Sequence, residues 1–238
     1  MTGNRGHGPA VVLLSGGMDS ATTLAIAKHR GHGPIYALTI RYGQRHEREI
    51  RSAQALARRY GARSIVLDVP VGKIAPSALT RGSWEIPSER SAKEMRKEIP
   101  STYVPARNTI FLSLALALAE SVRAEAIYIG VNAIDYSGYP DCRPEYLRAF
   151  RRLAGLATAR SVKGEGTPRI VAPLIGKTKA DIVRWGDRLK VPWELTWSCY
   201  RGGERPCGRC DSCILREKGF AEATKEVNNT RRWGKRSR

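Results

Sequence analysis

Five short apolar runs, each followed by a segment with helical spacing, constrain the fold of this chain most. The runs cover residues 10–14, 35–42, 64–69, 126–131 and 169–174. The helical segments cover residues 21–30, 46–60, 108–122, 144–157 and 179–189. Runs that are apolar throughout, rather than at every second residue, are typical of parallel strands that are covered on both faces. We therefore predict an α/β fold, an open parallel sheet with helices on both faces.

The turn after the first run has the composition of a phosphate-binding loop. Its sequence, LLSGGMDSAT at residues 13–22, joins an apolar run to a helical segment. At the carboxyl end of a parallel strand, the following helix N-terminus directs backbone N–H groups toward a ligand. Two glycines let the backbone approach an anion, Ser15 and Ser20 supply hydroxyl donors, and Asp19 suits either a helix cap or a Mg²⁺ ligand. The loop matches neither GxxxxGK[ST] nor GxGxxG. No lysine follows it, which favours chemistry at an α-phosphate with departure of pyrophosphate.

Four of the five cysteines lie close together near the C-terminus, with the spacing C-x7-C-x2-C-x2-C. Four thiolates at such spacing suit a closed tetrahedral Zn²⁺ site, whereas the C-x2-C-x2-C run is also typical of iron–sulfur ligands. Free reduced thiols are the third alternative. The predicted ligands are Cys199, Cys207, Cys210 and Cys213.

The chain is strongly basic, with 41 Lys and Arg against 22 Asp and Glu and a formal charge of +19. Such a charge favours polyanions or anionic small molecules. No apolar run reaches the about 18 residues that a membrane span requires. The N-terminal residues lack the pattern of a signal peptide, so we expect a cytoplasmic protein.

Five stretches together resemble one enzyme family. SGGMDS is similar to the loop of PP-loop ATP pyrophosphatases, and four further stretches narrow the resemblance to the 7-cyano-7-deazaguanine synthases, the QueC family. They are RYGQRHERE (41–49), STYVPARNTIFLSLA (101–115), IGVNAIDYSGYPDCRPEY (129–146) and ELTWSC with the cysteines that follow (194–213). The resemblance extends from about Ala10 to Ala223.

The resemblance implies an ATP-dependent reaction. In it, 7-carboxy-7-deazaguanine, ammonia and two ATP give the nitrile, through an adenylated carboxylate, an amide and an adenylated amide. It further implies Mg²⁺, one structural Zn²⁺ in place of an iron–sulfur cluster, and a homodimer. The alternatives are a relative that stops at the amide, or one that acts on RNA through its basic surface.

Several side chains are expected to bind ATP or to act in the reaction. The predicted ATP-binding residues are Leu14, Ser15, Gly16, Gly17, Met18, Asp19, Ser20, Ala21, Thr22, Gly130 and Asn132. The predicted catalytic residues are Asp19, Arg107, Lys177 and His46. Arg107 suits a bidentate phosphate contact. Lys177 would neutralise departing pyrophosphate unless it is a solvated lysine, and His46 would move protons unless it is a surface histidine.

The stretch at residues 135–146 offers tyrosines to stack on a flat heterocycle and acids to read a guanine-like edge. The predicted substrate-binding residues are Asp135, Tyr136, Asp141, Arg143 and Glu145. Cys142 is not needed as a nucleophile in the implied chemistry.

We predict a leader at residues 1–9 and an ATP-binding α/β domain at residues 10–192 with an insertion around 71–106. A zinc-binding segment at 193–224 and a basic tail without regular structure at 225–238 follow. The tail permits contact with nucleic acid, which the reaction does not require.

Overall fold

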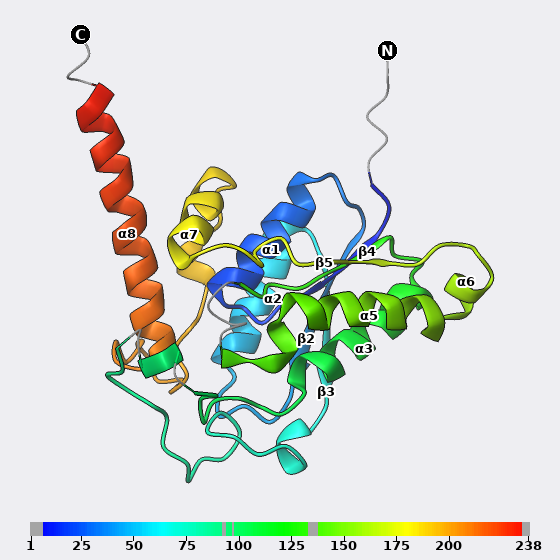
Figure 1. Cartoon of the computed structure of the whole chain (residues 1–238), viewed down its shortest axis with the longest axis horizontal. Helices are drawn as coiled ribbons and strands as arrows, with labels where there is room; N and C mark the ends of the chain where they lie inside the picture. The colour runs from blue at the N-terminus through cyan, green and yellow to red at the C-terminus, as the bar shows by residue number, and fades with distance from the viewer. Residues whose placement is uncertain (1–6, 92–93, 97, 133–137, 235–238) are drawn as a thin grey trace.

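A parallel sheet forms the centre of the computed structural model, which describes residues 7–91, 94–96, 98–132 and 138–234 (Figure 1). Within these residues it has five strands, in the order β3-β2-β1-β4-β5. They are β1 (Ala10–Leu13), β2 (Ile35–Arg41), β3 (Arg63–Asp68), β4 (Ala126–Tyr128) and β5 (Arg169–Val171). Ala10 in β1 pairs with Ile35 in β2 on one side and with Ala126 in β4 on the other. The strand order therefore reverses beside β1, and the carboxyl ends of β1 and β4 flank the position where sheets of this kind bind ligands.

Helices cover both faces of this sheet, as the apolar runs predict. The α-helices that the structure describes are α1 (Met18–His29), α2 (Arg48–Tyr60), α3 (Arg107–Ser121), α5 (Pro144–Ala157), α6 (Ala159–Val162), α7 (Lys179–Arg188) and α8 (Asp211–Gly234). Short 3-10 helices lie at Val71–Lys73, Glu94–Arg96, Pro140–Cys142 and Trp193–Leu195. Within the described residues, no helix combines the length and apolar character that crossing a membrane requires.

The buried residues form a separate core on each face of the sheet. Ala10 and Val12 of β1 belong to the core that α1, α2 and α7 cover. Val11 and Leu13 belong to the opposite core, with α3 and α5. Successive side chains of a strand point to opposite faces, so a strand between two cores must be apolar at every position.

The insertion lies against the cysteine-rich segment. Ser88 forms an isolated antiparallel bridge with Cys210, and the backbone nitrogen of Glu89 donates to the carbonyl of Arg209 at 2.8 Å. Arg90 forms a salt bridge with Asp211, at the start of α8. These contacts attach the middle of the insertion to the segment that carries the predicted metal ligands.

Helix α8 continues to Gly234 at the red end of the chain (Figure 1), although we predicted a tail without regular structure from residue 225. Between Asp211 and Gly234 the sequence contains no proline, and its one internal glycine is Gly219. The basic residues after 225 therefore do not end the helix.

Candidate functional site

A cavity lies at the carboxyl ends of β1, β2 and β4, where the strand order reverses. The loop after β1 and the start of α1 line one part of it. The end of β2 and the first turns of α2 and α3 line another part. Trp197, Ser198 and Tyr200 of the C-terminal segment, with Ser212 and Leu215 of α8, also line the cavity.

The loop after β1 holds its backbone through serine hydroxyls. The backbone nitrogen of Ser15 donates to the Ser20 hydroxyl at 3.2 Å, and that hydroxyl donates to the carbonyl of Gly17 at 3.0 Å. The N-cap of α1 is Gly17, which has no side chain to satisfy the first N–H groups of the helix. This helix N-terminus therefore faces the cavity with donors suited to an anion.

Gly16 lies in the tightest part of this loop. Its φ is +87°, and a Cβ there would lie 2.8 Å from the backbone nitrogen of Ala53 in α2. The carbonyl of Gly16 also accepts a hydrogen bond from the backbone nitrogen of Trp197 at 2.9 Å. The phosphate loop therefore packs directly against α2 and is held by the C-terminal segment.

Asp19 does not cap α1. Its Oδ2 lies 2.6 Å from Lys179 Nζ at the start of α7 and accepts a hydrogen bond from Asn132 Nδ2 at 3.3 Å. Its other oxygen, Oδ1, is buried and has no hydrogen-bond partner within the described residues. A buried carboxylate oxygen normally binds a donor or a cation. Asp19 therefore offers one ligand atom beside a lysine at the cavity wall.

The cavity lining also includes a cation, Arg107, together with aromatic and acidic groups. The Arg107 guanidinium lies 5.6 Å from the ring centroid of Tyr42, and Glu49, Tyr139 and Cys142 line the cavity as well. Burial raises the pKa of Glu49 to about 7, although the charge of Arg107 acts in the opposite direction. Burial likewise raises the pKa of the Tyr42 phenol, which stays protonated. The cavity lining thus combines a permanent cation with a carboxyl group that titrates near neutral pH.

Of the predicted ATP-binding residues, Leu14, Ser15, Gly17, Met18, Asp19, Ser20 and Gly130 line the cavity. The other four do not line it: Gly16, Ala21, Thr22 and Asn132. Thr22 donates to the carbonyl of Met18 at 2.9 Å, and Asn132 contacts Asp19. A Cβ on Gly130 would lie 3.1 Å from the backbone of Ser20, so a glycine lets β4 approach α1 closely.

Two predicted catalytic residues lie outside the cavity lining. Lys177 precedes the Thr178 cap of α7, and its Nζ lies 5.1 Å from the ring centroid of Trp185. Lys179, two residues later, reaches the cavity instead. His46 packs against Gly202 and lies 6.5 Å, centroid to centroid, from Trp197, and burial lowers its pKa.

Of the predicted substrate residues, the three that the structure describes do not line the cavity. Asp135 and Tyr136 lie outside the described residues. Arg143 and Glu145 are exposed. Asp141 is buried, and its Oδ2 accepts a hydrogen bond at 2.8 Å from the backbone nitrogen of Asn108, so it caps α3. The side chain of Asn108 donates to the backbone carbonyl of Asp141 at 3.3 Å and to Cys142 Sγ at 3.1 Å.

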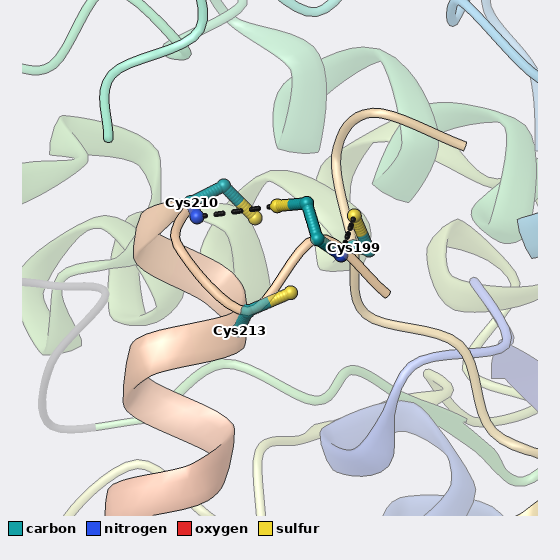
Figure 2. Close-up of side chains that lie close together, drawn as sticks. Cys199, Cys210 and Cys213 are labelled. Atoms are coloured by element: carbon teal, nitrogen blue, oxygen red, sulfur yellow. Dashed lines mark hydrogen bonds between the residues drawn. The ribbon is translucent and has the colours of Figure 1, made fainter. Parts of the chain in front are cut away.

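The four clustered cysteines can hold a metal ion. The Sγ atoms of Cys199, Cys207, Cys210 and Cys213 all lie within 4.8 Å of one another. In Figure 2 the side chains of Cys199, Cys210 and Cys213 point toward a common centre. Cys207 Sγ accepts the backbone N–H of Cys210 at 3.3 Å, and Cys199 Sγ accepts that of Cys207 at 3.4 Å. Burial opposes ionisation of Cys207, but such N–H donors outweigh it and lower the pKa of this thiol. Four converging sulfurs fit a tetrahedral thiolate site with no open position.

The residues that the sequence did not single out include Glu49, Lys179, Tyr42 and Trp197. Three of them lie within the stretches RYGQRHERE and ELTWSC, and Lys179 follows the predicted Lys177 by two positions. Their position in the chain is the other sequence feature that could have identified them. Glu49 and Lys179 each occupy the first turn of a helix that begins at the carboxyl edge of the sheet.

Comparison with known proteins gives a consistent match. The family model described as "Queuosine biosynthesis protein QueC" matches residues 9–224. A relative from Syntrophus aciditrophicus, named 7-cyano-7-deazaguanine synthase, is 54% identical over 217 residues, which cover 90% of this chain and 93% of the relative. A protein of the same name from Thermoplasma acidophilum is 54% identical over 217 residues, covering 91% and 89%. Among solved structures, NMN synthetase from Francisella tularensis is 15% identical, with a TM-score of 0.48 over 86% of this chain and 71% of that one. The family match spans the sheet, the cavity and all four cysteines.

Proposed function

Because the chain belongs to the QueC family of queuosine biosynthesis proteins, we propose that it is an ATP-dependent ligase that makes 7-cyano-7-deazaguanine from 7-carboxy-7-deazaguanine and ammonia. The observation that carries this proposal is the loop after β1 at the reversal of strand order, which opens on a cavity that Arg107 and Lys179 also line. A carboxylate is a poor electrophile, and the oxygen of an amide is a poor leaving group. Each is therefore converted to an adenylate, with one ATP consumed per stage.

The loop after β1 is proposed to bind the phosphates of ATP through the backbone of Ser15–Ser20. Lys179 and Arg107 both line the cavity, where they would neutralise charge at the α-phosphate and on the departing pyrophosphate. Asp19, with its buried Oδ1, would hold Mg²⁺. When bound, Mg²⁺ supplies charge neutralisation at the phosphate oxygens. Gly130 and Asn132, at the end of β4, are proposed to border the nucleotide.

The heterocycle is proposed to bind between Tyr42, Tyr139 and Tyr200, whose rings offer flat apolar surfaces at the cavity. Asp135, Tyr136, Arg143 and Glu145 remain predictions as substrate ligands. His46 and Lys177 are proposed here as supports of the site rather than as catalytic groups, because neither lines the cavity.

Zinc is the metal proposed for the four cysteines, since a redox-neutral reaction requires no iron–sulfur cluster and four thiolates leave no open coordination position. The site would fix the C-terminal segment that donates a hydrogen bond to the phosphate loop. We further propose a leader at 1–9, the catalytic domain at 10–192, a zinc-binding segment at 193–224 and a basic extension at 225–238. A homodimer and a cytoplasmic location belong to the same proposal.

The test is incubation of the purified chain with 7-carboxy-7-deazaguanine, ATP, Mg²⁺ and ammonium, followed by mass spectrometry. We expect the nitrile, with two AMP formed per nitrile. Amide without nitrile would favour a relative that stops at the first stage. Neither product, together with modification of an RNA substrate, would replace the proposal with the RNA-directed alternative.

A further inference from the structure

Among the described residues that line the cavity, two are acidic, Asp19 and Glu49. They lie on different helices, α1 and α2, and have different surroundings. Asp19 lies on α1 and forms a salt bridge with Lys179 at 2.6 Å. Glu49 is the second residue of α2, in the same cavity lining as Tyr42 and Arg107. Because Asp19 is neutralised by a lysine, the two carboxyl groups are suited to different tasks.

Glu49 lines the cavity together with two other titratable groups, Arg107 of α3 and Tyr42 at the end of β2. The charge of Arg107 acts on Glu49, and the charge of Glu49 acts on Tyr42. The charged neighbours of Glu49 in sequence, Glu47 and Arg48, are not part of the cavity lining within the described residues. Glu47 forms a salt bridge with Arg41 at 3.0 Å, and the guanidinium of Arg48 lies 5.0 Å from the ring centroid of Trp197.

The surroundings of Glu49 give its carboxyl group a pKa that suits a general base. Burial disfavours its ionised form, while Arg107 favours it, and together they place its pKa at about 7. A general base works best when its pKa lies near the working pH. A fully solvated carboxylate, with a pKa of about 4.3, would be a much weaker proton acceptor.

Amide formation requires such a group. Ammonia attacks the carbonyl carbon of the acyl adenylate, a C–N bond forms, and the nitrogen becomes positively charged. AMP departs with the electron pair of the C–O bond, and one proton must leave the nitrogen for the neutral amide to form. Without proton loss, the tetrahedral adduct expels ammonia again.

We propose that the Glu49 carboxylate, held at the first turn of α2 in the same cavity lining as Tyr42 and Arg107, accepts the proton that the attacking ammonia loses. The inference rests on the proposed function and adds the catalytic base to it. It assigns to Glu49 the proton transfer that the sequence pattern assigned to His46.

The test compares Glu49→Gln, which keeps the shape of the side chain, with Glu47→Gln as the matched control on the same helix. Adenylation is measured alone, as exchange of labelled pyrophosphate into ATP that depends on 7-carboxy-7-deazaguanine without ammonium. Amide formation is then measured in single turnovers at several pH values, with each rate expressed per concentration of free ammonia.

We expect Glu49→Gln to retain adenylation within a few-fold and to lose amide formation by at least about 100-fold, the usual contribution of a general base. The wild-type rate per free ammonia should rise with pH through about 7, because the base acts when ionised, and this rise should vanish in the variant. Hydroxylamine, whose adduct loses its proton readily to water, should restore acyl transfer in Glu49→Gln. Glu47→Gln should match the wild type in all three measurements.

Three results would overturn the role. Unchanged amide formation in Glu49→Gln would show that another group takes the proton. Loss of exchange together with amide formation would make Glu49 a binding or structural residue. Failure of hydroxylamine to restore acyl transfer would show that proton acceptance is not what the variant lacks. Absence of exchange in the wild-type protein is a separate outcome, since it would refute the proposed function itself.

Discussion

Replacement of Gly16 by alanine should destabilise the protein in two ways. One is the strain of a Cβ at a positive φ, and the other is the close contact of that Cβ with α2. Gly16 has a φ of +87°, where an L-residue with a Cβ costs about 1–2 kcal/mol. Its Cβ would also lie 2.8 Å from the backbone nitrogen of Ala53 and 2.9 Å from Ser52 Cβ, and closer still to the carbonyl oxygen of Glu49. Backbone atoms cannot rotate away as a side-chain tip can, so α2 must shift. Overpacking of this kind costs typically about 1–3 kcal/mol.

Gly31→Ala is the matched control, because Gly31 has a φ of +80° but no atom within 4 Å of its built Cβ. It should lose only the backbone cost. We therefore expect Gly16→Ala to be less stable than Gly31→Ala by about 1–3 kcal/mol, or roughly 2–12 °C in Tm for a chain of this size. Gly17→Ala, whose nearest atoms lie at 3.6 Å, should be close to wild type. Urea and thermal unfolding measure all three. Equal losses in Gly16→Ala and Gly31→Ala would refute the close contact between the loop and α2.

The remaining predictions concern the metal and a helix cap. The pure protein should contain about one zinc per chain, and Cys210→Ser should lose it, lower the Tm and expose the segment around Ser88 to proteases, because that residue pairs with Cys210. Stoichiometric iron with visible absorption would contradict a zinc site. Asp181→Ala should lower the free energy of unfolding by about 1 kcal/mol at pH 7, since it removes the reciprocal cap with Thr178. Burial raises the pKa of Asp181, but hydrogen bonds from Thr178 outweigh this and lower it from 3.8 to about 2. The contribution is therefore present above pH 3.8 and is lost as the pH falls through about 2, so the wild-type and variant stabilities should converge in acid.

The sheet and the phosphate loop could be predicted because both are local patterns. Each predicted strand begins within one residue of its observed start, as the start of β3 at Arg63 rather than residue 64 illustrates. A strand buried on both faces leaves a continuous apolar run, whatever the rest of the chain does. The SGGMDS turn is equally local, since its hydrogen bonds join Ser15, Gly17 and Ser20.

The substrate stretch was harder to interpret, because the partner of a polar side chain there lies far away in sequence. Asp141 looks like a ligand for a guanine-like edge, yet it binds the backbone nitrogen of Asn108, 33 positions earlier. A buried helix N-terminus needs an acceptor for its N–H groups, and a carboxylate from another element can supply it. From the sequence alone, a carboxylate that caps a distant helix cannot be distinguished from one that binds a ligand.

The charged residues of the cavity share a position at the start of a helix, which the sequence alone did not identify. Asp19, Glu49, Arg107 and Lys179 each occupy the first or second position of α1, α2, α3 or α7. The predicted start of the last helical segment, residue 179, is also the observed start of α7. A correct helix start does not show which of two nearby lysines, Lys177 or Lys179, reaches the cavity.

The signs of these charges are informative, because a cation at a helix N-terminus is unfavourable by about 0.3–1 kcal/mol. Acids such as Asp19 and Glu49 need no further reason to be there. Arg107 and Lys179 oppose the helix dipoles of α3 and α7. Lys179 is compensated by its salt bridge with Asp19, whereas the placement of Arg107 in the cavity lining is consistent with the anionic ligand that we propose there.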